Sequence, residues 1–156
     1  MEPFITSSNI EKFDLLVAKL LADLYERFPI ATAITASEHG IDAESMFRGD
    51  DTIDHDIAAA LDFFCNTVRW LKRAGYIDYD SELDSGTFSE LVLTAKALEI
   101  LKATPSSLTG KQTLGSYLVD SARSGATEAL KQGVTTALSA GVSLAWAAVK
   151  TQIGHS

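Results

Sequence analysis

Hydrophobic residues recur at helical spacing in two long segments of the first half of the chain, and each segment predicts an amphipathic helix. The first segment follows Ser8, whose three-residue spacing to Glu11 is that of a capping box, and it ends near Arg27. The second covers residues 54–74, and Gly75 is placed to end it in a left-handed conformation. The face of the second helix that we expect to be buried carries Ile57, Leu61, Phe64, Val68 and Leu71.

Shorter elements are predicted between and after these helices. Residues 76–80 and 87–93 predict two strands around a polar turn at 81–86, and Thr94 is placed to cap a helix that continues to Leu101. The sequence before the second long helix predicts a short strand at 30–34, a short helix at 35–39 and a polar loop or weak helical turn at 41–53. We therefore expect a mostly α-helical fold with a small β-hairpin.

Two short runs beside the expected hairpin resemble those of winged-helix domains. The first, WLKRAGYI at residues 70–77, ends the long helix before the hairpin, and the second, LTAKAL at residues 93–98, opens the helix after it. Ala97 departs from the pattern, because such proteins often have glycine at this position. The resemblance covers about residues 9–104 and implies a winged-helix-like α+β domain. Residues 104–110 form the expected boundary to a helical tail at 111–153.

Negative charge is concentrated in the part of the chain that such domains commonly use to bind DNA. The net charge is −8, and residues 42–84 hold eleven acidic and four basic residues. Winged-helix proteins commonly place their third helix in the major groove, where phosphate contacts require cations. In this chain the third predicted helix is the one at 54–74. The one basic cluster, Arg69, Lys72 and Arg73, lies at the helix end usually turned away from the groove. We therefore expect a protein partner, with DNA binding through this cluster as the alternative. The acidic face expected to contact the partner comprises Asp54, Asp56, Asp62, Asp78, Asp80, Glu82 and Asp84.

Two aromatic residues of the same helix are candidate anchors for a partner. Phe63 and Trp70 lie seven residues apart, and both lie off the main apolar face. Packing of the two rings against the hairpin, as part of the core, is the favoured interpretation. The alternative is that both rings are exposed and insert into a partner, as aromatic residues at interfaces often do.

Small residues recur at every fourth position of the tail from Ser121 onward. Glycine inside an exposed helix costs about 1 kcal/mol relative to alanine, so regularly spaced glycines indicate an offsetting gain, such as close packing between helices. The tail is therefore expected either to fold back on its own domain, with a hairpin at one of the glycines, or to self-associate or dock into partner helices. For self-association into a homo-oligomer, the expected contact residues are Gly125, Ala129, Gly133, Ala137, Gly141 and Ala145.

Membrane insertion is a third use of the tail that the sequence leaves open. Residues 132–149 are uncharged and would span about 27 Å as a helix. A bilayer core is about 30 Å thick, and this segment also contains five polar residues. The segment is therefore too short and too polar for a permanent membrane span. Reversible or multimeric insertion is the kind of membrane binding that the sequence leaves open.

The sequence contains no arrangement of residues that predicts catalysis, and we expect neither enzymatic activity nor a cofactor. The alternating acids at 78–84 mimic a calcium loop, but Leu83 and Ser89 stand where glycine and glutamate are needed, so no metal site is expected. The single cysteine, Cys65, excludes an internal disulfide and lies beside an apolar helix face. The first residues do not have the pattern of a signal peptide, which favours a cytoplasmic location.

These observations together predict a non-enzymatic interaction and assembly module of a bacterial or phage regulatory or defence-type complex. Its acidic winged-helix face would bind a protein partner, and its tail would assemble the module. The alternative is a dimeric winged-helix DNA-binding transcriptional regulator. The third possibility is a membrane-active effector that inserts its C-terminal helix.

Overall fold

The computed structural model describes residues 8–46, 53–106, 108 and 112–153, and for residues 145–153 it describes only the backbone. The described chain is mostly α-helical and has a small antiparallel sheet, as the sequence predicts. Its contacts form two compact units. We call Met1–Glu26 with Ala95–Ser156 the helical unit, and Arg27–Thr94 the sheet unit.

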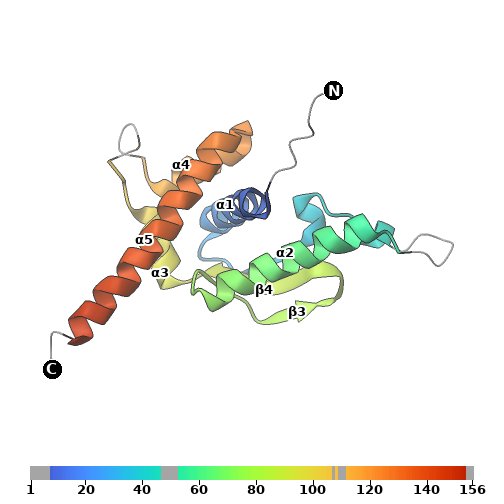
Figure 1. Ribbon diagram of the computed structural model, residues 1–156, viewed down its shortest axis with the longest axis horizontal. Coiled ribbons are helices and arrows are strands. Elements are labelled where there is room, and N and C mark those ends of the chain that lie inside the picture. Colours follow the sequence, from blue (N-terminus) through green and yellow to red (C-terminus); the bar gives the residue numbers. More distant parts are fainter. Residues whose placement is uncertain (1–7, 47–52, 107, 109–111, 154–156) are drawn as a thin grey trace. The chain divides into compact units, whose positions relative to one another are not determined.

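The helical unit is built from α1 (Asn9–Arg27), α3 (Ala95–Lys102), α4 (Leu114–Ser124) and α5 (Thr127–Ile153). α5 packs along α4, and α3 contacts both helices (Figure 1). Gly125 ends α4 with a φ of 70°, in the left-handed region that glycine adopts without strain. The tail is therefore a helical hairpin that reverses at Gly125, which was one of the arrangements left open by the sequence.

Two glycines allow the helices of this unit to approach closely. A β-carbon at Gly133 of α5 would lie 2.5 Å from Leu118 Cδ2 of α4, so no larger residue fits without displacing a buried leucine. A β-carbon at Gly115 of α4 would lie 2.6 Å from three atoms of the Tyr25 ring of α1. The Tyr25 hydroxyl also shares a 3.2 Å hydrogen bond with Thr113 Oγ1, just before α4. α1 and α5 thus lie close to α4 because the two glycines have no side chain at these contacts.

These contacts place α1 with the C-terminal helices. Besides the contact of Tyr25 with Gly115, Lys131 Nζ of α5 lies 3.7 Å from Glu11 Oε2 of α1. The two compact units consequently divide the chain after Glu26 and after Thr94, whereas the sequence boundary was placed at 104–110. Sequence order hides this pairing, since α1 and α4 are separated by the whole sheet unit.

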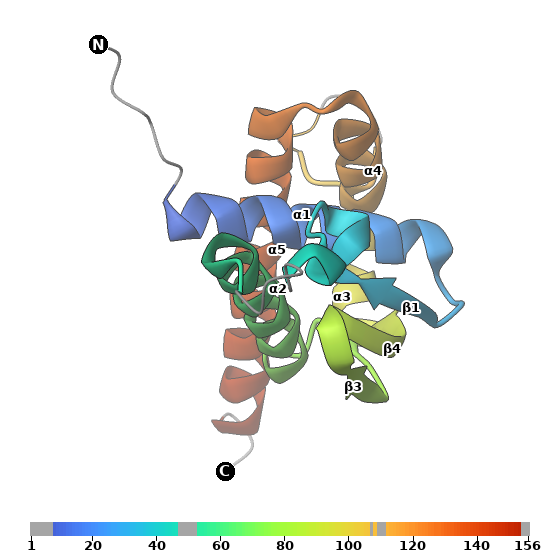
Figure 2. The same cartoon turned by 90° about the vertical axis from the view of Figure 1, so that its right-hand side faces the viewer.

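The sheet unit contains one long helix, α2 (His55–Arg73), and four strands: β1 (Thr32–Thr35), β2 (Ile77–Asp78), β3 (Ser81–Leu83) and β4 (Thr87–Leu93). β4 pairs antiparallel with β1 along one edge and with β2 and β3 along the other, as Figure 2 shows for β1, β4 and β3. Short 3-10 helices occupy Ala36–His39, Ala43–Met46 and Asp84–Gly86. The segment predicted as a short helix at 35–39 is therefore a single 3-10 turn.

The core of the sheet unit forms where α2 meets β4. Phe64 of α2 and Phe88 of β4 are both fully buried, and their ring centroids lie 6.1 Å apart. Of the five residues predicted for the buried face of α2, Phe64, Val68 and Leu71 are fully buried, and Ile57 and Leu61 are half-buried. Gly75 follows α2 with a φ of 85°, which confirms its predicted left-handed conformation.

The hairpin differs from the sequence prediction at residues 81–86. A polar turn was expected over this whole segment, but Ser81–Leu83 is a strand that pairs with β4, and only Asp84–Gly86 turns. The Ser81 and Ser89 hydroxyls lie 2.7 Å apart across the two strands. All three β3 residues are exposed, so the segment lacks the alternation of apolar and polar residues by which a half-buried strand is identified.

Two glycines of the sheet unit that both have positive φ provide a test of this packing: Gly86 lies in the hairpin turn, and Gly40 follows the 3-10 helix Ala36–His39. A β-carbon at Gly86 would lie 2.6 Å from Leu61 Cδ1 and 2.9 Å from Ala36 Cβ, whereas nothing lies within 4 Å of one at Gly40. We expect Gly40→Ala to lower the free energy of unfolding by about 1 kcal/mol, from backbone strain alone. Gly86→Ala should lower it by about 2–4 kcal/mol, because steric overlap is added to strain. Urea denaturation followed by circular dichroism measures both, and equal losses would contradict the packing around Gly86.

Candidate protein-interaction surface

The acids at and near the start of α2 have local structural roles. Asp54 is the N-cap of α2, and its Oδ1 accepts hydrogen bonds from the backbone N–H groups of Asp56 (3.0 Å) and Ile57 (3.2 Å). Asp62 accepts a hydrogen bond of 3.1 Å from the side chain of Asn66, one turn later. Asp56 is exposed in the first turn, where a negative charge is favoured by the helix dipole. Of these three predicted contact residues, Asp54 already uses its carboxylate to begin the helix.

Arg69, from the basic cluster, is paired with an acid of the hairpin. Its Nε donates to Glu82 Oε2 at 3.0 Å, and its Nη2 donates to Glu82 Oε1, so the contact is bidentate. These hydrogen bonds lower the pKa of Glu82 below its ordinary value and raise that of Arg69. Both side chains remain partly exposed. The guanidinium is therefore committed to the hairpin within the chain itself.

Lys72 is held by the same hairpin, one turn further along α2. Its Nζ donates a 2.9 Å hydrogen bond to the carbonyl of Tyr79, lies 3.6 Å from Asp78 Oδ1 and sits 4.2 Å from the centre of the Tyr79 ring. Arg73 is exposed at the end of α2. Two of the three cations proposed for phosphate contacts are thus surrounded by groups of the hairpin that already compensate their charge.

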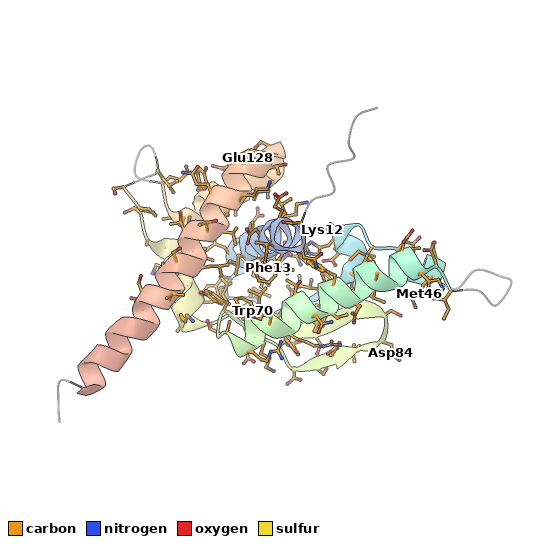
Figure 3. The ribbon with its side chains drawn as sticks, in the orientation of Figure 1. Lys12, Phe13, Met46, Trp70, Asp84 and Glu128 are labelled. Carbon is orange, nitrogen blue, oxygen red and sulfur yellow. The ribbon has the colours of Figure 1, made fainter. Side chains whose placement is uncertain are left out.

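The negative charge that these pairs leave exposed lies at the outer part of the hairpin. Asp80 is exposed beside β3, and Asp84 is exposed at the turn between β3 and β4, where Figure 3 labels it. Asp78, Asp80 and Glu90 line a pocket of about 480 Å³ together with Tyr79. Within the described residues, no group of three or more histidine, cysteine or acidic side chains is arranged to hold a metal ion. Excess negative charge at this edge is therefore open to an external partner.

Glu90 is a member of this surface that sequence reasoning missed. It has a φ of 58°, and the pairing of β1 with β4 shifts register beside it, from Thr32 opposite Leu91 to Ile34 opposite Phe88. The extra residue in β4 is a β-bulge, which changes the direction of the side chain. An alternating sequence places Glu90 only on one strand face, so no sequence signal indicated its proximity to Asp78 and Asp80.

The two candidate aromatic anchors differ in exposure. Trp70 is 38% exposed, and its ring stacks on that of the buried Tyr76, with centroids 6.3 Å apart (its position on α2 is labelled in Figure 3). Burial raises the pKa of the Tyr76 hydroxyl. Phe63 is half-buried. Trp70 therefore presents part of one ring at the surface while its stacked face supports the hairpin side of the core.

Several members of the strip of small residues in the tail have roles within the chain. Gly125, one of the residues expected to contact a second copy if the tail self-associates, lies between α4 and α5 and reverses the chain. Gly133 packs against Leu118 of the same chain, and Ala137 and Gly141 are buried. Ala129 is half-buried, and the side chain of Ala145 lies outside the described residues. In the described part of the strip, Gly133 therefore packs closely within the helical hairpin that α4 and α5 form.

Two further observations concern chemistry and membranes. Burial raises the pKa of the Cys65 thiol, so the group is protonated at neutral pH. In the part of the chain that the structure describes, no helix combines the length and the apolar character needed to cross a bilayer.

Comparison with protein-family models, with characterised proteins and with solved structures gives no match to this chain.

Removal of the Glu82 carboxylate tests the ion pair that holds the hairpin. Because the pKa of Glu82 is lowered in the folded protein, the ionised form contributes stability above its ordinary value of 4.5, and this stability is lost as pH falls through the lowered pKa. The pair is partly exposed, so we expect Glu82→Gln to reduce the free energy of unfolding at pH 7 by only about 0.5–1 kcal/mol. The difference from the wild type should shrink as the pH is lowered below 4.5.

The control for this experiment is Asp80→Asn, which removes the same charge from the same hairpin at an exposed position. Urea denaturation of the three proteins at several pH values gives the comparison. Equal effects of the two substitutions at pH 7 would mean that net charge, and not the pair with Arg69, accounts for the loss.

Proposed function

We propose that this protein is a non-catalytic interaction and assembly module of a bacterial or phage regulatory or defence-type complex, acting in the cytoplasm. The sheet unit binds a basic protein partner through an acidic hairpin surface, which we define as Asp78, Asp80, Glu82, Asp84 and Glu90. The helical unit assembles the module. One observation carries this proposal: the hairpin acids hold Arg69 and Lys72, while Asp80 and Asp84 keep exposed negative charge.

The order of elements from α1 to α3 supports a winged-helix-like domain, which includes the sheet unit and two helices of the helical unit. A helix, a short strand, a long helix, a hairpin and a further helix follow one another, as the resemblance implies. Between the short strand and the long helix, where a further short helix was expected, the chain has the 3-10 segments Ala36–His39 and Ala43–Met46. α2 then takes the place of the helix that such domains commonly insert into the major groove.

Electrostatics favours a protein partner over DNA for this unit. A phosphate backbone approaching α2 would meet Asp56 and Asp62 near its start and the hairpin acids near its end. Arg69 and Lys72 would have to exchange their hydrogen bonds with the hairpin for contacts to phosphate. DNA affinity depends mainly on such cation contacts, so this surface is poorly suited to it. A basic protein surface is attracted by the same charges and needs no exchange of pairs.

Charge removal at the hairpin tests the proposed partner class. Full-length protein is immobilised, and bound proteins are recovered from a lysate of the source cells. We expect Asp80→Asn/Asp84→Asn to reduce recovery of a basic protein about tenfold or more, because two exposed acids of the surface lose their charge. Glu38→Gln/Glu44→Gln removes the same charge from exposed positions elsewhere in the sheet unit and should leave recovery unchanged. Equal loss with both double variants would contradict a local acidic interface.

Titration with a duplex DNA in low salt distinguishes the alternative. We expect no saturable binding. Salt-sensitive binding that is weakened by Arg73→Ala would instead support a DNA-binding regulator and would overturn the proposal for the sheet unit.

A further inference from the structure

The helical unit has an apolar groove between α3 and α5. The groove encloses about 430 Å³, and its lining includes Ile100 of α3, Ala103 just after α3, and Ala140, Ser143 and Leu144 of α5. Glu99 of α3 is the charged residue of the lining. Leu144 is 37% exposed at one side of it. Such a groove with a large apolar side chain at its margin is suited to receive a helix.

The α5 face that borders the groove carries a large and a small residue that fit against each other when two copies of this face meet. Leu144 follows Ala140 by one helical turn, so a large and a small residue are neighbours on one face. If a second α5 lies antiparallel across this face, Leu144 of each copy meets Ala140 of the other and enters the space beside Ala103. A two-fold axis produces both contacts at once, because the same surface is used by the two subunits.

Charges on α3 are also complementary to themselves. Glu99 lines the groove, and Lys102 lies three residues further along α3, outside the lining. Glu99 and Lys102 are both exposed and lie three residues apart on α3, so they share a helix face. The α5 side carries no charged residue between Lys131 and Leu144. Reversal by a two-fold axis places Glu99 of one copy beside Lys102 of the other, and the second pair forms symmetrically. A uniformly acidic or basic partner would match only one of the two charges.

We propose that the groove between α3 and α5 binds a second copy of this chain and forms a two-fold symmetric dimer. This inference rests on the assembly role in the proposed function and names the surface that performs it. The surface differs from the strip of small residues suggested by sequence, because Gly133 packs within the helical hairpin, on Leu118.

Two substitutions on α5 test the surface directly. Leu144→Asp introduces a charge into the groove margin, whereas Val142→Asp introduces the same charge two residues earlier. Val142 is 58% exposed, does not line the groove and lies about 160° around the helix from Leu144. Sedimentation equilibrium of the full chain over about a hundredfold range of concentration measures the dimer dissociation constant. We expect Leu144→Asp to raise that constant roughly tenfold or more and Val142→Asp to leave it unchanged.

A charge exchange on α3 tests whether the occupant is a second copy. In the Glu99→Lys variant, the new lysine of each copy faces Lys102 of the other copy, so both symmetric pairs become repulsive. We expect the dimer dissociation constant to rise roughly three- to tenfold. Glu99→Lys/Lys102→Glu reverses both signs and should restore the wild-type constant. All positions are exposed, and far-UV circular dichroism verifies that each variant is folded.

The outcomes separate this inference from the proposal on which it rests. A wild-type chain that stays monomeric throughout the concentration range overturns self-assembly as well as the dimer surface. A dimer that is dissociated by Val142→Asp but not by Leu144→Asp retains assembly and places the interface on the other face of α5. Neither result affects recovery of a basic partner by the hairpin surface.

Discussion

The arrangement of the sheet unit depends on β4. In the described chain β1, β2 and β3 all hydrogen-bond to this strand, and they do not form a ladder with one another. Phe88, Leu91 and Leu93 of β4 are buried, so the strand supplies much of the apolar surface on the sheet side of the core. The acidic residues of the hairpin are positioned by their pairing with β4 and, for Glu90, by the bulge within it.

The contacts that hold the hairpin to α2 also determine the charge of the surface. Arg69 and Lys72 lie three residues apart, so both face the same side of α2 and reach neighbouring parts of the hairpin. Each cation neutralises an acid that would otherwise repel its neighbours. The remaining carboxylates are concentrated further out, at Asp80 and Asp84, where no cation of α2 is paired with them among the described contacts. The ion pairs that hold the hairpin and the distribution of exposed charge therefore come from one set of interactions.

The sequence predicted the elements whose signals are local. The apolar period of α2 and the glycine at 75 both act within a few residues, and the structure confirms this helix. What escaped prediction depends on distant partners. β3 is exposed on both faces and is defined by pairing with β4, and the place of α1 is defined by Gly115, which lies far away in sequence. The role of Gly125 was ambiguous because a regular four-residue spacing describes a continuous helix as well as a reversal.

The candidate surface shows the same division. The acidic character of the candidate surface follows from composition, and seven acids of α2, its N-cap and the hairpin were identified in advance, four of which belong to the acidic hairpin surface. Their individual roles were not, because capping by Asp54 and pairing by Glu82 require knowledge of neighbouring side chains. Glu90 was missed since a bulge changes strand register without any residue type that is specific to it.

The unequal lengths of α4 and α5 have a consequence for how this protein can change over evolution. α4 has 11 residues and α5 has 27, so at a rise of about 1.5 Å per residue α5 is longer by roughly 24 Å. Contacts that form the hairpin, such as that of Gly133 with Leu118, lie near the reversal at Gly125. Substitutions or insertions in the distal turns of α5 therefore leave these contacts in place. The chain can acquire new binding specificity at that end while its helical hairpin continues to fold in the same way.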